Sequence, residues 1–215
     1  MKAGDIITFG SYPQYRDGSE DSIEWQVLEV EEGKALLLSR YILDVKPFND
    51  EAKVIYWNSC TLRKWLNGEF LNNAFTEEEQ NQIYLPPENE QDINAEHFWF
   101  FWHPGRPMNV DSSSWNMTDK VFLLSHEDIS RYFRGGDNET SCPGASAEAT
   151  EYVQEKYSEW YSQNERDGRG IWWLRSSSAQ HPIAYIVSPA DTIGFTVILP
   201  GSLNGIRPAL WLKDE

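Results

Sequence analysis

The feature that most constrains the fold is the order of the hydrophobic patterns, which run from strands to helices and back to strands. Apolar and polar residues alternate over residues 23–30, and a turn leads into an apolar run at residues 35–39. This pattern predicts a β-hairpin. Strand-like segments return near the end of the chain, at residues 171–175, 183–187, 194–199 and 206–212. An α+β fold whose first and last strands share a sheet explains this order most simply. With no internal repeat or linker, residues 1–215 are expected to form a single domain.

In the middle of the chain, apolar residues recur at the spacing that is typical of helices. Leu62 and Leu66 share one face of a helix predicted within residues 59–83, and Asn67-Gly68 has the form of a helix stop. A third helix is predicted over residues 147–161, where apolar and aromatic residues recur at intervals of three and four.

Two capping boxes mark helix starts. Thr76 is followed three residues later by Glu79, and Ser125 is followed by Asp128. In each pair the two side chains can satisfy backbone N–H groups that the first turn of a helix leaves free.

The charge balance narrows the range of partners. The chain has 18 Lys and Arg against 34 Asp and Glu, which gives a net charge of −16. Such a surface repels phosphate backbones and anionic lipids, so neither nucleic acid nor a membrane is an expected partner. No apolar run is long enough to span a bilayer, and the first residues have no signal-peptide core. The expected location is the cytoplasm, or the cell exterior if the chain is a fragment of a longer exported protein.

Seven strings in the sequence resemble one family from start to end. They are residues 4–14, 23–28, 35–39, 57–67, 119–125, 172–176 and 205–212. Together they resemble the bacterial domain-of-unknown-function 6273 family, which is common in gut anaerobes. The resemblance covers nearly the whole chain, and it implies no activity because that family has none assigned.

A weaker resemblance concerns the fold. The Trp-Trp-x-x-Ser element at residues 172–176 and the Gly-x-Arg-Pro element at residues 205–208 look like the closing parts of C-type-lectin-like domains. The resemblance implies a C-type-lectin-like fold, with a twisted antiparallel sheet built from both termini, flanking helices and long loops. Formylglycine-generating enzymes share that fold group and bind copper through a cysteine pair near the C-terminal end. No cysteine follows Cys142 here, so that chemistry is not carried over.

Trp173 and Arg175 are the first candidate ligand-binding residues. In a strand they share one face, opposite to Trp172 and Leu174. That face can be a ligand wall, where an indole stacks on a sugar ring and a guanidinium binds a carboxylate. The other interpretation is a core tryptophan beside an arginine that satisfies buried carbonyls or acids. Arg207 likewise allows two interpretations, a ligand contact or a structural ion pair.

The second candidate group lies in an aromatic loop at residues 97–103, where seven aromatic or imidazole side chains are consecutive. Trp99, Trp102, His103 and Arg106 could form a stacking platform or an oligomer contact. The segment could also be an inserted element that buries its own rings. Its histidines lack a zinc-type spacing, so no metal is expected.

These observations favour a non-catalytic binding module that holds a glycan or protein ligand without calcium or any other cofactor. No nucleophile elbow, phosphate loop or dinucleotide fingerprint occurs, so no catalytic residue is assigned. Two alternatives remain: a hydrolase with paired carboxylates, and a structural subunit that forms homo-oligomers. Cys60 and Cys142 could form a disulfide or stay as two buried thiols.

Overall fold

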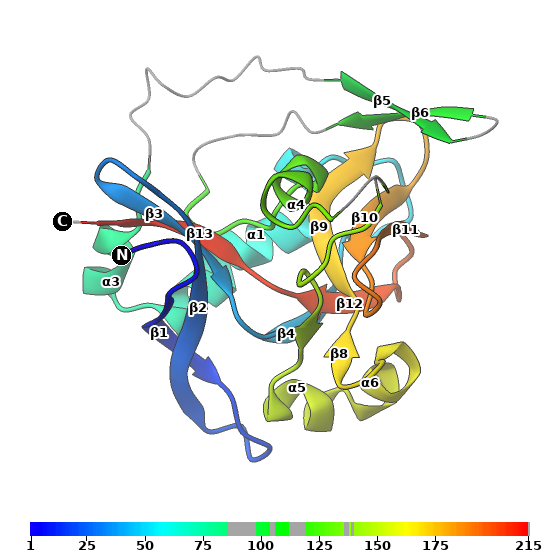
Figure 1. Ribbon diagram of the computed structural model, residues 1–215. Helices are drawn as coiled ribbons and strands as arrows, with labels where there is room; N and C mark the ends of the chain where they lie inside the picture. The colour runs from blue at the N-terminus through cyan, green and yellow to red at the C-terminus, as the bar shows by residue number, and fades with distance from the viewer. Residues whose placement is uncertain (86–97, 104–105, 112–118, 136–137, 139, 215) are drawn as a thin grey trace.

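The computed structural model describes residues 1–85, 98–103, 106–111, 119–135, 138 and 140–214, with 98–103 and 106–111 described by their backbone. The fold of the described residues is α+β, with two larger, mainly antiparallel sheets, a third sheet of two short strands, and short helices (Figure 1). No helix in these described ranges is long and apolar enough to cross a membrane.

The first sheet contains both ends of the chain. Its order is β1 (Ile6–Pro13), β2 (Glu20–Glu31), β3 (Lys34–Ser39) and β13 (Ala209–Lys213), and every neighbouring pair is antiparallel. The Met1 amino group lies 3.3 Å from the Asp214 carboxylate. The predicted hairpin and the sharing of one sheet by the first and last strands are therefore confirmed.

The second sheet is built around one buried strand. Its main order is β11 (Ile193–Val197), β10 (Ile183–Val187), β9 (Trp172–Ser178), β12 (Leu203–Ile206) and β4 (Asp44–Pro47). A hairpin of β5 (Phe98–His103) and β6 (Arg106–Asp111) joins it, because β6 also pairs with β9. Every residue of β9 is buried, so this strand is covered on both faces.

One predicted strand is two strands in the structure. Residues 206–212 divide at Arg207-Pro208 into the last residue of β12 and most of β13, and these strands belong to different sheets. Proline lacks a backbone N–H, which makes it a natural break between two ladders. The prediction of one continuous strand was wrong at this point.

The helical region before residue 83 is broken into short pieces. They are η1 (Trp57–Ser59), α1 (Thr61–Trp65), η2 (Leu66–Phe70), α2 (Leu71–Ala74) and α3 (Glu77–Gln82). Asn67-Gly68 does not stop the helix, because the chain continues through it as the π-type turn η2. The Asn67 side chain donates to the Val121 carbonyl at 2.8 Å and accepts from the Val121 N–H at 3.2 Å, and so anchors this turn.

Both predicted capping boxes are present, and the third helix differs from its prediction. Thr76 with Glu79 starts α3, and Ser125 with Asp128 starts α4 (His126–Tyr132). The helix expected over residues 147–161 is replaced by three elements. They are the short strand β7 (Ala147–Glu148), which pairs with β8 (Arg169–Gly170), and the helices α5 (Glu151–Lys156) and α6 (Ser158–Asn164). Thr150 caps α5 through its side chain, which explains the later start.

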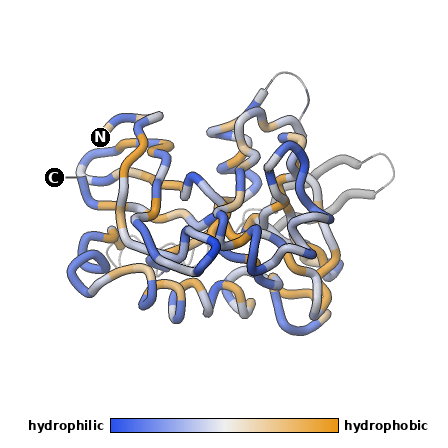
Figure 2. The backbone as a smooth tube through the Cα atoms, turned by 90° about the horizontal axis from the view of Figure 1, so that it is seen from below, coloured by the Kyte–Doolittle hydropathy of each residue, from blue (hydrophilic) through white to orange (hydrophobic). Residues whose placement is uncertain are grey.

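The core draws on both sheets. Its largest fully buried side chains include Trp25, Trp57, Trp172 and Trp173. Figure 2 shows hydrophobic and hydrophilic stretches alternating along the backbone, with several of the outermost turns hydrophilic. Cys60 and Cys142 are both buried free thiols, and burial raises the pKa of each to about 12.

Candidate functional site

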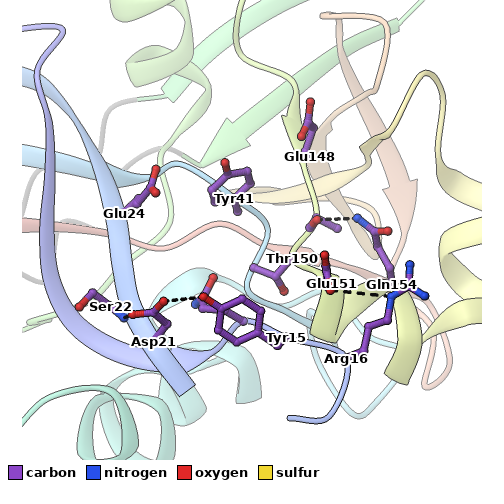
Figure 3. Close-up of a pocket in the computed structure, with 12 residues that line it drawn as sticks. Tyr15, Arg16, Asp21, Ser22, Glu24, Tyr41, Glu148, Thr150, Glu151 and Gln154 are labelled. Carbon is purple, nitrogen blue, oxygen red and sulfur yellow. Dashed lines mark hydrogen bonds and ion pairs between the residues drawn. The ribbon is translucent and has the colours of Figure 1, made fainter. Parts of the chain in front are cut away.

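A pocket of about 430 Å³ lies between the β1–β2 hairpin and the start of α5 (Figure 3). This volume falls in the range of small-molecule sites. The pocket is lined by Gln14, Tyr15, Arg16, Asp21, Ser22, Glu24, Tyr41, Glu148, Ala149, Thr150, Glu151 and Gln154.

The first wall is the end of the β1–β2 hairpin. The Tyr15 hydroxyl donates to Asp21 Oδ2 at 2.7 Å, which joins the two strands across the turn. The same hydrogen bond lowers the pKa of Asp21 and raises that of Tyr15. The Tyr15 side chain remains 47% exposed, so its ring is available to a ligand.

The second wall is the segment that leads into α5. Its backbone is fixed by Ile42, whose N–H donates to the Glu148 carbonyl at 2.9 Å and whose carbonyl accepts from Thr150 N–H at 3.1 Å. Tyr152 N–H donates to the Gln14 carbonyl at 3.1 Å, so the second wall is bonded directly to the first. The pocket is therefore held open by main-chain bonds as well as by side-chain packing.

A buried network connects the elements behind both walls. Asp44 of β4 accepts a hydrogen bond from the Tyr12 hydroxyl on β1 at 2.6 Å and one from the Tyr157 hydroxyl after α5, also at 2.6 Å. Burial, with the negative charge of Asp44, raises the pKa of both tyrosines. Both hydroxyls therefore stay protonated near neutral pH and act as donors.

The lining is mainly acidic. Among its charged residues there are four carboxylates, on Asp21, Glu24, Glu148 and Glu151, and one guanidinium, on Arg16. Arg16 lies 3.8 Å from Glu151, and Glu24 forms a 2.6 Å ion pair with Arg40 beside the pocket. Such a site offers many hydrogen-bond acceptors, two tyrosine rings and the amides of Gln14 and Gln154.

Comparison with known families identifies the family of this chain. A family model described as "Domain of unknown function (DUF6273)" matches residues 32–214, which is most of the chain. The chain belongs to the DUF6273 family. No curated protein and no solved structure matches it. The resemblance that the sequence strings carried is confirmed at the level of the family.

The range matched by the DUF6273 model contains only part of the pocket lining. The match begins at residue 32, just after β2 ends at Glu31, so the pocket residues between 14 and 24 lie outside the matched range. Tyr41 and the segment 148–154 lie inside it. One wall thus belongs to the family region, and the other is supplied by the hairpin before it.

Two candidate ligand residues of this DUF6273 chain lie in the core. Trp173 is fully buried, and its indole N–H donates to the Lys46 carbonyl at 2.9 Å. Arg175 is 4% exposed, donates to the Leu123 carbonyl at 2.7 Å and pairs with Asp128 at 2.8 Å. Of the two interpretations of this face, the structure has the second, a core tryptophan beside an arginine that bonds a buried carbonyl and an acid. β9 is covered on both faces, and neither side chain lines the pocket.

The other four candidates lie on the β5–β6 hairpin, where the sequence had suggested a loop. Trp99 is opposite Val110, Trp102 is opposite Pro107, and His103 is opposite Arg106 in the strand register. The side chains of Trp99, Trp102, His103 and Arg106 lie outside the described residues, as does His97. Their role in ligand contact stays a prediction.

The pocket was not predicted from the sequence. Its lining comes from three segments far apart in the chain, and no single motif contains it. The available local signals were the polar turn after Tyr15 and the cap formed by Thr150. Neither signal predicts a pocket until the fold places the two segments side by side.

Proposed function

We propose that this chain is a non-catalytic recognition module that binds a glycan or protein ligand in the pocket between the β1–β2 hairpin and α5. The observation that carries the proposal is the pocket lining. Carboxylates, amides and two tyrosine rings converge on a space of about 430 Å³. Ligand sites are typically concave and use a few polar groups, with aromatic surface, to orient what they bind.

A glycan suits this set of side chains. Carboxylates and amides can accept and donate hydrogen bonds to sugar hydroxyls without a bridging ion. The rings of Tyr15 and Tyr41 supply an apolar surface for a sugar face. Within the described residues no group of three His, Cys, Asp or Glu side chains is placed to hold a metal. The mode that we propose is direct and independent of calcium.

A hydrolase is the second candidate, and the shared placement of Glu24 and Glu148 on the pocket favours it. Hydrolysis of a glycosidic bond uses two carboxyl groups on opposite sides of that bond. Glu24 already bonds Arg40 at 2.6 Å, which reduces its freedom to transfer a proton. For this reason we place binding before catalysis.

The proposal is tested by glycan-array screening of the wild-type chain, followed by calorimetric titration of the strongest hit. Tyr41→Ala and Glu148→Gln should each weaken binding about tenfold, which corresponds to about 1.4 kcal/mol. Glu159→Gln on α6 is the matched control, since Glu159 is an exposed acid outside the pocket, and it should leave the affinity unchanged.

Two results would count against this function. One is equal affinity of the wild type and both pocket variants. The other is release of shortened sugars from the hit, detected by mass spectrometry and abolished by Glu148→Gln, which would favour the hydrolase.

The finer fold assignment is part of the same proposal. We infer a C-type-lectin-like architecture, because an antiparallel sheet contains both ends of the chain and helices flank it. In such folds the ligand-binding residues lie on irregular segments at one side of a rigid sheet. An experimental structure with a different order of strands in the terminal sheet would overturn this assignment.

A further inference from the structure

The edge strand β11 has an outer side that, past its first residue, pairs with no strand of the described residues. It is the last strand of its sheet and pairs with β10 on its inner side only (Figure 1). Its outer side is met by the segment 140–141 at its start, where Ile193 N–H donates to the Thr140 carbonyl at 2.8 Å. In the described part of the chain no other strand pairs with this side.

The alternation of backbone groups fixes which ones face outward. Ile193 N–H points away from β10, and Ile198 N–H points toward it, to the Pro182 carbonyl at 2.6 Å. Successive N–H groups in a strand point to opposite sides. Phe195 and Val197 therefore direct their N–H and C=O groups to the free edge.

The side chains along this edge are apolar and exposed. Phe195 is 48% exposed, Val197 is 44% exposed, and Leu199, just past the strand, is 49% exposed. Single exposed apolar residues are ordinary, but these three recur at every second position and form a continuous row. Natural edge strands are usually protected by lysine, proline or a bulge, and β11 has none of these within its bounds.

The region around β11 is also almost uncharged. Between Arg175 and Arg207 the only charged residue is Asp191, in a chain whose net charge is −16. Two copies of such an acidic chain repel each other over most of their surface. Residues 192–206 carry no charge, so β11 itself adds nothing to this repulsion when a second copy approaches it.

We propose that β11 pairs with the β11 strand of a second copy, antiparallel and about a twofold axis at Thr196. In this register Phe195 lies opposite the partner's Val197, and the outward backbone groups make four hydrogen bonds. Pairs of an aromatic and a β-branched residue are favourable across antiparallel strands. The strand contains both halves of that pair, so it is complementary to itself. A twofold contact uses both free edges and closes the assembly at a dimer.

The first test measures the mass of the full chain by light scattering and sedimentation over a range of concentrations. The wild type should shift from 24.9 kDa toward twice that mass as concentration rises. Val197→Lys should raise the dimer dissociation constant at least tenfold, because a charged lysine would replace the β-branched side chain opposite the partner's Phe195, and both copies would bring an ammonium group to the same edge. Val30→Lys is the matched control, a strand valine 37% exposed on the other sheet, and it should dimerise like the wild type.

The second test uses the register and does not require a destabilising change. Thr196→Cys should form an intermolecular disulfide with oxidised glutathione as oxidant, because the two Thr196 positions face each other at the axis. Val54→Cys, at another exposed position, should not. A wild type that is monomeric at every concentration, or a dimer that resists Val197→Lys and gives no Thr196→Cys cross-link, overturns the proposal.

Discussion

Arg207 shows how much a single buried side chain can organise in this protein. Its guanidinium donates to the Ser39 carbonyl at 2.7 Å and to the Ala145 carbonyl at 2.9 Å, and it lies 5.3 Å from the ring of Trp172. Desolvation by burial lowers the pKa of Arg207 to about 9, although the charge of Asp191 opposes this. The sequence allowed a structural ion pair for this residue, and the structure shows carbonyl acceptors as its hydrogen-bond partners.

Arg207→Lys should destabilise the fold by about 2–4 kcal/mol. A lysine keeps the charge but loses the planar fork that reaches two carbonyls and stacks on a ring, and each unsatisfied buried group costs about 1–3 kcal/mol. Urea denaturation measures the change. Arg166→Lys, at a side chain 70% exposed, is the control and should move the midpoint little. Equal midpoints for the two variants would contradict the structural role of Arg207.

At the scale of elements, one carboxylate both caps the start of α4 and forms an ion pair with β9. Asp128 accepts from the Ser125 N–H at 2.8 Å, and the same oxygen pairs with Arg175 at 2.8 Å. Asp128→Ala should destabilise the fold by about 3–5 kcal/mol, since it removes one partner of a largely buried pair. Glu79→Ala removes the equivalent acid of the exposed capping box on α3 and should cost about 1 kcal/mol. Thermal unfolding of both variants compares the two effects, and similar losses would refute the buried pairing.

The elements also show what local sequence can and cannot predict. The caps at Thr76 and Ser125 were predictable, because each depends on two residues three positions apart. The continuation of the helix through Gly68 was not, because it depends on a bond from Asn67 to Val121, 54 residues away. The burial of Trp173 and Arg175 likewise depends on which strands lie beside β9. That neighbourhood comes from distant parts of the chain, as does the pocket.

At the scale of the whole molecule, the network around Asp44 makes stability depend on alkaline pH. Tyr12 and Tyr157 have pKa values raised in the fold, first by burial and then by Asp44. The unfolded value is about 10, so the contribution of these groups is complete below that pH and is lost as pH rises above it. Tyrosinate absorbance should show these two residues ionising only as the chain unfolds. Tyr12→Phe should remove part of this alkaline loss, and an unchanged pH profile would contradict it.

The two-residue link between β12 and β13 has a wider consequence. Ile206 pairs with Asp44 in one sheet, and Ala209 pairs with Leu38 in the other. The C-terminal residues 203–213 therefore join the two sheets, because removing them would break the pairing of β12 with β4 and of β13 with β3 together. The two sheets therefore cannot separate unless β12 leaves β4 or β13 leaves β3.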